Sequence, residues 1–570
     1  MILICISMQG MDSGAGRSKG TKGSSPACGK RPFPITCHLR TAVQGSEKGQ
    51  AGRHLRCRLR LPLSFFGCKI EAISLKNPLF SGRNALTDTA QALVELRRDV
   101  GESHVITDKD AVGRASLDGR GRRQGRALAV VRPGSTAETA AVMKTAAKYG
   151  LIVIAQGGNT SNVGGATPEP GAPDEEAART IVLQMGRMRR IIGVDPVNNT
   201  LTVQAGAVLA QVQQAAAEKG RLFPLSLAAE GSAEIGGVIA TNAGGVHVLR
   251  YGMARRMVLG LKVVLADGRV LDLMRALRKD NSGYSLVQLF CGSEGTLGVI
   301  TEAVLAIEPA PKAINSAWLV LPRLGAADTL FEELEAAFGP SLTAFEIIGR
   351  APLESLREAE GKVPPVSIGD WQALIDVSSW GDAGESAQAR LEELLADELD
   401  RGVIADGMIA QSEAEREMLW SLREGIPLAV KRLGGNVKHD ISVPRSKLAV
   451  FVRRTTKALK ELFPGVEPSV FGHYGDGNLH FNVGPAEIAF PHEEAIHRLV
   501  HARVVKAGGS IAAEHGVGSL KTDEIARIKS PEEIAAFAAI KRAFDPECRL
   551  NPGRIVRTEP VESLPFDGRQ

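Results

Sequence analysis

Two histidines lie on either side of an Asp-Gly pair in the stretch FGHYGDGNLHFNV, residues 471–483. If Asp476 and Gly477 form a two-residue hairpin loop, His473 faces His480 on the next strand. Directly opposed residues share one face of a sheet, with Cβ atoms ~5 Å apart, so the two imidazoles could bind one metal ion. A stacked polar pair without a metal is the alternative interpretation, and this stretch alone leaves it open.

A second Asp-Gly pair shows that a hairpin by itself predicts no chemistry. The stretch LKVVLADGRVLDL, residues 261–273, also predicts a hairpin, about Asp267 and Gly268. The same pairing rule places Val264 opposite Leu271 there, and neither side chain can bind a metal ion. A metal site at the two histidines therefore requires further ligands from elsewhere in the chain.

The stretch AEHGVG, residues 513–518, supplies a third candidate ligand, Glu514, with His515 beside it. A catalytic zinc ion typically has three protein ligands and one open position, and two histidines with Glu514 provide that number. The small residues around the Glu-His pair would fit a tight pocket. An isolated Glu-His pair is more often a surface feature, and that interpretation also stays open.

Three glycine-rich stretches predict close contact between the backbone and one large ligand. They read QGGNTSNVGG (residues 156–165), IGGVIATNAGG (235–245) and GSEGTLGVIT (292–301), and each lies beside a predicted strand. Glycine lets the backbone approach a ligand and turn its N–H groups toward a phosphate. The first stretch continues as loop sequence and not as a helix. It is therefore not the Rossmann fingerprint, which disfavours a nicotinamide dehydrogenase. A surface loop is the alternative for any single stretch.

The elements that must position these residues alternate between strands and helices. Strands are predicted at residues 127–131 and 151–155. The helix between them begins at the N-cap Ser135, with Glu138 as the second member of a capping box, and ends at Gly150. This strand–helix–strand unit leads directly into the first glycine-rich stretch.

The second half of the chain has a different pattern, and Pro309 and Pro311 mark the boundary. It mixes strands such as residues 317–322 and 373–379 with helices such as 385–399, which predicts an α+β domain. A last helix begins with Ser530 as its N-cap, followed by proline and by glutamate at the third helical position.

The charge of the chain is concentrated at its N-terminus. The 570 residues carry a net charge of +5, but residues 1–70 hold 12 Lys/Arg and 2 Asp/Glu, or +10, which leaves −5 for the rest. An acidic body with 4% aromatic residues argues against nucleic-acid binding. No apolar run approaches the ~18 residues of a membrane span. Residues 1–80 are predicted to be a basic, disordered extension of a cytoplasmic protein, and a transit peptide for the mitochondrial matrix is the alternative.

Taken in order, the motifs resemble those of FAD-linked dehydrogenases of the vanillyl-alcohol oxidase superfamily, most closely the D-2-hydroxyglutarate and D-lactate dehydrogenases. The resemblance covers residues 127–557. Beyond the three glycine-rich stretches, it rests on RYG (250–252), LADG (265–268), RKDNSGY (278–284), GHYGDGNLH (472–480), AEHGVG (513–518) and LNP (550–552). It implies an α+β fold with a PCMH-type FAD-binding domain of two α+β subdomains and an α+β substrate (cap) domain with an antiparallel sheet. The implied boundaries are 81–308 for the FAD domain, 309–500 for the cap domain and 501–557 for a C-terminal segment that returns to the FAD domain.

The resemblance also implies how FAD is bound. The implied contacts to the pyrophosphate are Gly157, Gly158, Asn159, Thr160, Ser161 and Gly164. Those near the flavin are Gly236, Gly237, Thr241, Asn242 and Gly245, with Asn551 returning from the C-terminus. Some relatives attach FAD covalently through a histidine of the first stretch. Residues 156–166 contain none, so non-covalent FAD is predicted.

The histidine site gains roles from the same resemblance. His473, His480 and Glu514 match metal ligands, with Zn²⁺ as the expected ion, and His515 matches the base that takes the substrate's hydroxyl proton. The implied substrate contacts, besides His515, are Arg423, Lys438 and Asn482. Two cations suit a dicarboxylate. Pro427 stands where D-2-hydroxyglutarate dehydrogenases have threonine, however, so one donor to the distal carboxylate is missing.

The predicted function is FAD- and metal-dependent oxidation of a D-2-hydroxy acid, D-2-hydroxyglutarate or D-lactate, with hydride transfer to flavin N5. The alternatives are a zinc hydrolase with structural glycine stretches, a glycolate or other 2-hydroxy-acid oxidase subunit, and a flavin-binding subunit without turnover. The chain has no iron–sulfur or haem motif, so the electrons require an external acceptor, a quinone or an electron-transfer flavoprotein. The sequence does not determine the oligomeric state, and a homodimer stays open.

Overall fold

The computed structural model of the protein describes residues 85–381 and 384–557, which belong to one compact unit. The basic extension predicted for residues 1–80, with its transit-peptide alternative, lies outside the described residues. The described chain mixes helices with mainly antiparallel sheets, as the predicted α+β fold requires.

The first region contains a four-stranded sheet in the order β1-β2-β4-β3. Its strands are β1 (Val105–Ile106), β2 (Ala129–Val131), β3 (Ile152–Gln156) and β4 (Thr180–Gln184). β2, β4 and β3 are parallel, and β1 is antiparallel to β2. The helices of this part are α1 (Ala85–Val100), η1 (Glu102–His104), α2 (Lys109–Ala115), α3 (Thr136–Tyr149) and α4 (Asp174–Ala177).

Helix α3 begins and ends where the sequence predicts. The Ser135 hydroxyl accepts a hydrogen bond from the Glu138 N–H, and Gly150 ends the helix in the left-handed conformation, with φ 63°. The Glu138 carboxylate accepts from the Gly134 N–H at 2.7 Å and not from that of Ser135. The return bond of the predicted capping box is therefore displaced by one residue.

A second, antiparallel sheet follows in the order β5-β6-β10-β8-β9. Its strands are β5 (Ile191–Asp195), β6 (Thr200–Gln204), β8 (Val258–Val264), β9 (Val270–Leu273) and β10 (Val299–Ala306). A separate pair is formed by β7 (Arg221–Leu222) and β11 (Glu308–Pro309). The helices are α5 (Leu209–Ala217), α6 (Ile235–Ala240), α7 (Val248–Tyr251), α8 (Ala254–Met257) and α9 (Leu286–Phe290).

The β8–β9 hairpin has a different register from the predicted one. Leu271 pairs with Val263, whereas the sequence analysis placed it opposite Val264. The Leu265 N–H donates to the Arg269 carbonyl, which leaves a three-residue loop, and Gly268 in this loop has φ 83°. A three-residue loop that ends in a left-handed glycine is a common hairpin connection, and its extra residue moves the register by one. The two-residue loop is therefore wrong here.

The third region is built on a seven-stranded antiparallel sheet in the order β15-β12-β14-β13-β17-β18-β16. Its strands are β12 (Ala313–Leu321), β13 (Leu342–Gly349), β14 (Trp371–Ser379), β15 (Asp406–Ile409), β16 (Asp440–Ser442), β17 (Glu467–His473) and β18 (Asn478–Gly484). Its helices are α10 (Ala326–Phe338), α11 (Arg350–Glu360), α12 (Gly384–Asp400), α13 (Glu413–Arg432), α14 (Arg445–Leu462), α15 (Ala486–Ala489) and α16 (Glu493–Ala507). Three short 3₁₀ helices also occur here, η2 (Gly339–Ser341), η3 (Tyr474–Asp476) and η4 (Phe490–His492).

The two faces of this sheet pack against different helices, and the alternation of strand residues decides which side chains reach each face. One core joins Leu479, Phe481 and Val483 of β18 to residues of α10, α12, α14 and α16. The other core joins Ile348 of β13 and Phe471 of β17 to residues of α11 and α13. The polar residues of β18 that alternate with Leu479, Phe481 and Val483 therefore lie on the α13 side of the sheet. Residues two positions away from Ile348 and from Phe471 lie on the same side.

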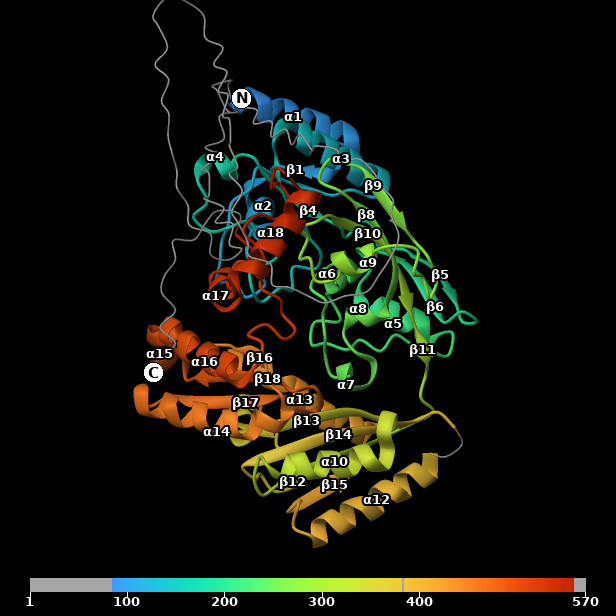
Figure 1. Ribbon diagram of the computed structural model, residues 1–570, viewed down its shortest axis with the longest axis vertical. Coiled ribbons are helices and arrows are strands. Elements are labelled where there is room, and N and C mark those ends of the chain that lie inside the picture. Colours follow the sequence, from blue (N-terminus) through green and yellow to red (C-terminus); the bar gives the residue numbers. More distant parts are fainter. Residues whose placement is uncertain (1–84, 382–383, 558–570) are drawn as a thin grey trace, which may run out of the picture. The chain divides into compact units, whose positions relative to one another are not determined.

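The C-terminal segment leaves the seven-stranded sheet and packs against the first region. It contains α17 (Thr522–Ile528) and α18 (Pro531–Phe544), whose predicted capping box at Ser530 is confirmed. The Lys541 ammonium donates to the Thr296 carbonyl, and Leu550 forms a parallel bridge with Val153 of β3. In Figure 1 these red helices accordingly lie beside blue and green elements, whereas α14 and α16 lie at the seven-stranded sheet.

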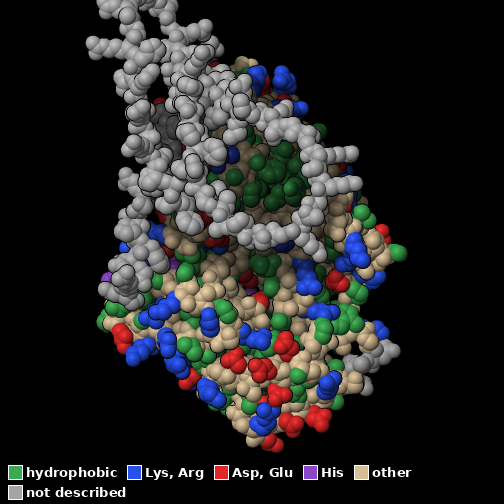
Figure 2. All heavy atoms as spheres, viewed as in Figure 1, with side chains coloured by type: hydrophobic (Ala, Val, Ile, Leu, Met, Phe, Trp, Pro, Cys, Tyr) green, Lys and Arg blue, Asp and Glu red, His purple; other side chains and the backbone are tan. Residues whose placement is uncertain are grey.

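Two properties of the described residues concern membrane spanning and nucleic-acid binding, the two functions that the sequence argues against. Within the described residues, none of the helices has the length and apolar character needed to cross a membrane. On the face shown in Figure 2, acidic and basic side chains are interspersed. On the part of this face that the described residues form, a basic stripe, the usual footprint of nucleic-acid binding, is therefore not present.

Candidate active site

A large cavity lies between the glycine-rich stretches and the seven-stranded sheet. Its empty volume is about 2140 Å³, including the part that is open to solvent. Residues from both sets that the sequence predicts to bind ligands, those of the glycine-rich stretches and those of the histidine site, line this one cavity. One side, the glycine wall, contains the predicted residues Gly157, Gly158, Asn159, Thr160, Ser161, Gly236, Gly237, Thr241 and Gly245. The other side, the charged wall, contains Arg423, Lys438, His473, His480, Asn482, Glu514 and His515.

The glycine wall consists of backbone that only glycine allows at some positions. A Cβ on Gly158 would lie 1.9 Å from the Ser232 carbonyl oxygen, and one on Gly245 would lie 1.8 Å from that of Ser226. A Cβ on Gly237, in helix α6, would meet no atom within 4 Å. The first two glycines are therefore required for contact between neighbouring loops, whereas Gly237 faces open space in the cavity.

Three predicted FAD residues do not line the cavity but connect the segments around it. The Asn551 amide donates to the carbonyls of Gly165 and Glu294, at 2.8 and 2.6 Å. The Asn242 side chain accepts from the Arg255 N–H at 2.8 Å. The Gly164 carbonyl accepts from the Arg554 guanidinium at 3.3 Å. Their hydrogen bonds connect the segments of the glycine wall outside the cavity.

The glycine wall fits a cofactor with phosphate groups. The backbone N–H groups of residues 158–162 donate no hydrogen bond to any described residue, so they are free to bind an anion. Glu234, at the start of α6, also lines the cavity, and burial raises the pKa of its carboxyl to about 7. Its Oε2 is buried and accepts no hydrogen bond from the described residues. The sequence analysis missed Glu234, and its only signal was an acidic residue directly before a glycine-rich stretch.

On the charged wall, the loop between the two histidines is longer than predicted. Phe471, and not His473, lies opposite His480, because the 3₁₀ turn η3 and Gly477, with φ 80°, lengthen the loop. The two-residue loop is therefore wrong. The pairing has moved by two positions, an even number, so His473 stays on the same face as His480. The two ring centroids are 5.8 Å apart.

The three candidate metal ligands lie together. His473 Nε2 is 3.1 Å from Oε1 of Glu514, and His480 Nε2 is 3.9 Å from its Oε2. The Oε1 atom is buried and accepts no hydrogen bond from the described residues. Burial lowers the pKa of His480 to about 4, so its ring is neutral, as a metal ligand must be. The carboxylates of Glu346 and Glu514 raise the pKa of His473 against the effect of burial, so a bound ion would displace a proton from that ring. Two imidazoles and a carboxylate that both rings approach fit a divalent ion such as Zn²⁺.

Glu346, in strand β13, binds one of these candidate ligands and a neighbouring arginine through hydrogen bonds. Its carboxylate accepts hydrogen bonds from His473 Nδ1 and, at 2.6 Å, from Arg423 Nε. Burial alone would raise the pKa of Glu346, but the charges of Arg423 and His473 lower it to about 2. A carboxylate on the second ring nitrogen of a histidine fixes which nitrogen faces the metal. The sequence analysis missed Glu346, although an acidic residue within the apolar strand LTAFEIIG was a usable signal.

Asp440, the first residue of β16, holds the Glu514-His515 pair in place. Its Oδ2 accepts from the N–H groups of Glu514 and His515, at 2.9 and 2.8 Å, and its Oδ1 accepts from the Asn478 amide. The same Oδ2 lies 3.4 Å from His515 Nδ1, which leaves Nε2 to face the cavity. Burial alone would raise the pKa of Asp440, but His515 and Lys521 hold it below its ordinary value. Asp440 is the third residue that the sequence analysis missed, after Glu234 and Glu346.

The predicted substrate contacts also lie on the charged wall. Arg423 lies over the Phe471 ring, with its Cζ 4.8 Å from the centroid, and its Nη groups donate to no described residue. Lys438 is exposed to the cavity, and Asn482 is buried beside it, with its Oδ1 accepting from the His439 N–H. Pro427 lies one helical turn after Arg423 on the cavity side of α13.

Comparison with known proteins identifies the family. Residues 127–274 match the FAD binding domain family, and residues 310–555 match FAD linked oxidases, C-terminal domain. The chain is 38% identical over 455 residues to the mitochondrial D-2-hydroxyglutarate dehydrogenase of Bos taurus, covering 80% of this chain and 81% of that protein. It is 36% identical over 458 residues to a probable mitochondrial D-2-hydroxyglutarate dehydrogenase of Oryza sativa subsp. indica, covering 80% of each.

A solved structure of p-cresol methylhydroxylase with substrate bound matches 83% of this chain and 97% of its own, with a TM-score of 0.64. At 15% identity this likeness shows the fold alone, and it confirms the predicted PCMH-type α+β architecture. The family match disfavours the zinc hydrolase. The chain therefore belongs to the FAD-linked D-2-hydroxyglutarate and D-lactate dehydrogenase family, and it is an FAD-dependent oxidoreductase.

Proposed function

We propose that the protein oxidises a D-2-hydroxy acid, D-2-hydroxyglutarate or D-lactate, to the 2-oxo acid. The observation that carries this proposal is that one cavity joins the glycine wall to the charged wall. An elongated cofactor along the glycine wall and a small hydroxy acid on the charged wall would meet inside it. The division into an FAD domain (81–308), a cap domain (309–500) and a returning segment (501–557) is part of the same proposal.

His473, His480 and Glu514 would bind the divalent ion, and His515 would remove the hydroxyl proton of the substrate. When bound, the ion lowers the pKa of that hydroxyl. When bound, FAD accepts the hydride from C2 at its N5. Asp440 fixes the His515 backbone and lies next to Nδ1, so the imidazolium that forms after proton transfer has a carboxylate beside it.

The carboxylates of the substrate would bind Arg423 and Lys438, with Asn482 as a further contact. Glu346 occupies Nε of Arg423, which leaves its planar Nη edge for a carboxylate. Two cations favour a dicarboxylate, and the names of the relatives agree with D-2-hydroxyglutarate. Pro427 has neither a hydroxyl nor an N–H to offer the distal carboxylate, so D-lactate remains a candidate of the same reaction class.

Three further properties belong to this proposal. FAD would be non-covalent, since residues 156–166 contain no histidine, and acid precipitation would then leave a colourless pellet. An external quinone or electron-transfer flavoprotein would take the electrons. The location is cytoplasmic unless residues 1–70 direct import, and N-terminal sequencing of the native protein separates the two, because import would remove the segment.

The decisive experiment is anaerobic reduction of the purified protein's flavin by single substrates. We expect D-2-hydroxyglutarate or D-lactate to bleach the oxidised-flavin absorbance, while the L-enantiomers leave it unchanged. Chelation of the metal should stop the bleaching, and re-addition of Zn²⁺ should restore it. D-malate, which also has two carboxylates, tests the length of the substrate. A protein without flavin, or equal reduction by both enantiomers, would refute the proposal.

A further inference from the structure

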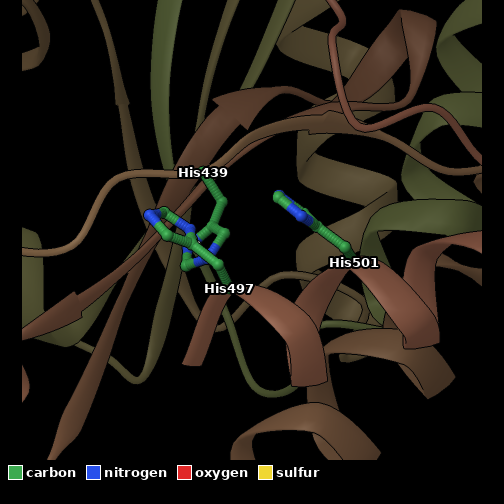
Figure 3. A group of neighbouring side chains, drawn as sticks. All are labelled: His439, His497 and His501. Carbon is green, nitrogen blue, oxygen red and sulfur yellow. Dashed lines mark hydrogen bonds between the residues drawn. The ribbon is translucent and has the colours of Figure 1, made fainter. Parts of the chain in front are cut away.

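A second histidine cluster lies behind the charged wall. His439 directly precedes β16, and His497 and His501 project from one face of α16, four residues apart. One nitrogen of each ring lies within 4.8 Å of the others. Figure 3 shows the rings of His439 and His497 together, with the ring of His501 pointing toward them. The sequence analysis missed this cluster, although the stretch HRLVH, residues 497–501, places two histidines four positions apart and was a signal for it.

The outer nitrogen of each ring faces an acceptor. His439 Nδ1 lies 2.8 Å from the Phe481 carbonyl oxygen. His501 Nδ1 lies 3.5 Å from Glu524, and His497 Nε2 lies 3.8 Å from Glu493. Histidines that bind a metal through one nitrogen usually direct the other N–H to a carbonyl or a carboxylate. His439 has this hydrogen bond, and the outer nitrogens of His497 and His501 each have a carboxylate within 4 Å.

The inner nitrogens are then left facing one another. His439 Nε2 and His497 Nδ1 are 2.9 Å apart. His439 and His501 are buried, and burial lowers the pKa of both rings, so both are neutral and keep a free lone pair near pH 7. A hydrogen bond between His497 and His439 satisfies one pair of nitrogens, but it gives the inner nitrogen of His501 no partner. A shared ion would give the inner nitrogens of all three rings a partner, since one nitrogen of each ring lies within 4.8 Å of the others.

We propose that His439, His497 and His501 form a second metal site, for a divalent transition-metal ion of the Zn²⁺ type. Three imidazoles suit Zn²⁺, Cu²⁺, Fe²⁺ or Ni²⁺, and a zinc ion with three histidines keeps a fourth position for water. Nitrogens bound at ~2.0–2.1 Å in a tetrahedron are ~3.4 Å apart, so the His439–His497 contact must widen by about half an ångström.

The ion would act as a clamp on the charged wall. It would tie α16 to the segment that contains Lys438, His439 and Asp440. The His439 N–H donates to Asn482, and Asp440 holds the backbone of His515. The site requires neither bound flavin nor substrate turnover, so metal binding at these three histidines can be tested separately from the proposed function.

Metal stoichiometry tests this site. The full-length flavoprotein is stripped with a chelator and titrated with Zn²⁺ by calorimetry. The segment before residue 81 contains five cysteines, and thiolates are zinc ligands, so each variant is compared with the wild type. We expect His497→Ala to bind one equivalent fewer than the wild type. His480→Ala should also lose one, from the other site, and the double variant should lose two.

His492→Ala is the matched control, because His492 lies just before α16 and packs on Phe463, outside both clusters. It should bind as much Zn²⁺ as the wild type. A folded His497→Ala variant with wild-type stoichiometry overturns the proposal. If that variant does not fold, His501→Gln, which keeps a polar side chain of similar length, takes its place and is judged by the same loss of one equivalent.

Discussion

The two walls of the cavity bind in opposite ways. The glycine wall offers backbone N–H groups and open space, and its loops come close together because residues such as Gly158 have no side chain. The charged wall offers side chains, and two buried carboxylates hold several of them: Glu346 holds Arg423 and His473, and Asp440 holds the backbone of Glu514 and His515. In the proposed function, one wall would select a ligand by shape and by its phosphate groups, and the other would provide the groups that hold and move a proton.

Two glutamates, the buried Glu346 and the half-buried Glu234, show the difference in one comparison. Glu346 on the charged wall has Arg423 and His473 as partners, and its pKa falls to about 2. Glu234 on the glycine wall has an oxygen without a partner, and burial raises its pKa to about 7. Desolvation raises the pKa of both carboxyls, so the charged partners of Glu346 decide the opposite direction of its shift.

The largest expected effect tests whether the charged wall performs proton transfer. His515→Ala should lower the rate of substrate-driven flavin reduction by about 10²–10⁴-fold, the usual contribution of a positioned base. The flavin spectrum and flavin content should stay unchanged, because His515 is not on the glycine wall. Stopped-flow reduction under anaerobic conditions measures the rate. Wild-type reduction by the variant would rule His515 out as the base.

The next effect tests whether the charged wall depends on its buried carboxylate. Glu346→Gln leaves Arg423 and His473 without their counter-charge, which should destabilise the protein by about 3–5 kcal/mol. It should also weaken metal binding by about 10–100-fold. The stabilisation by Glu346 is complete above pH 4.5 and is lost as the pH falls toward 2, so the variant should lose this acid dependence.

Denaturant unfolding and Zn²⁺ titration measure the two effects of Glu346→Gln. Glu413→Gln is the matched control, because its pair with Arg416 lies on the outside of the same helix as Arg423. An exposed pair contributes about 0–1 kcal/mol, so the control should change little. Equal losses in both variants would contradict the special role of Glu346.

The sequence predicted residues of both walls, but it did not predict the buried carboxylates that support the charged wall. Glycine-rich stretches and the motifs about His473 and Glu514 are local, so their residues could be assigned before any strand was paired. Glu346 and Asp440 reach the site only through pairing of distant strands in the seven-stranded sheet. Both hairpin registers were wrong because the sequence does not show how many residues a turn with a left-handed glycine contains. The shared face of the two histidines survived only because the shift was even.

A pair of glycine substitutions tests the glycine wall. Gly158→Ala puts a Cβ 1.9 Å from a carbonyl oxygen, so the loops must move, at a cost of about 1–3 kcal/mol, and flavin binding should fall. Gly237→Ala meets no protein atom within 4 Å and lies in a helix, so stability should rise by about 0.5–1 kcal/mol. Its methyl group still points into the cavity, so flavin affinity should fall. Flavin content and urea unfolding measure both, and full flavin affinity in Gly237→Ala would mean that FAD does not lie against α6.

The smallest effect concerns Glu234, the carboxyl without a full set of partners. Because its pKa is about 7 in the folded chain and 4.5 ordinarily, its contribution to stability is complete below pH 4.5 and is lost as the pH rises through 7. Glu234→Gln cannot ionise. With both proteins free of flavin, the variant should therefore be more stable than the wild type at pH 8. The shift corresponds to roughly 3 kcal/mol, which partial exposure reduces to about 1–2 kcal/mol.

Urea unfolding at pH 8 and pH 5 should show this gain shrinking at the lower pH, while Glu218→Gln, at the exposed end of α5, shows none. A loss of stability at pH 8 would mean that the ionised carboxylate has a partner, and the contrast with Glu346 would then fail.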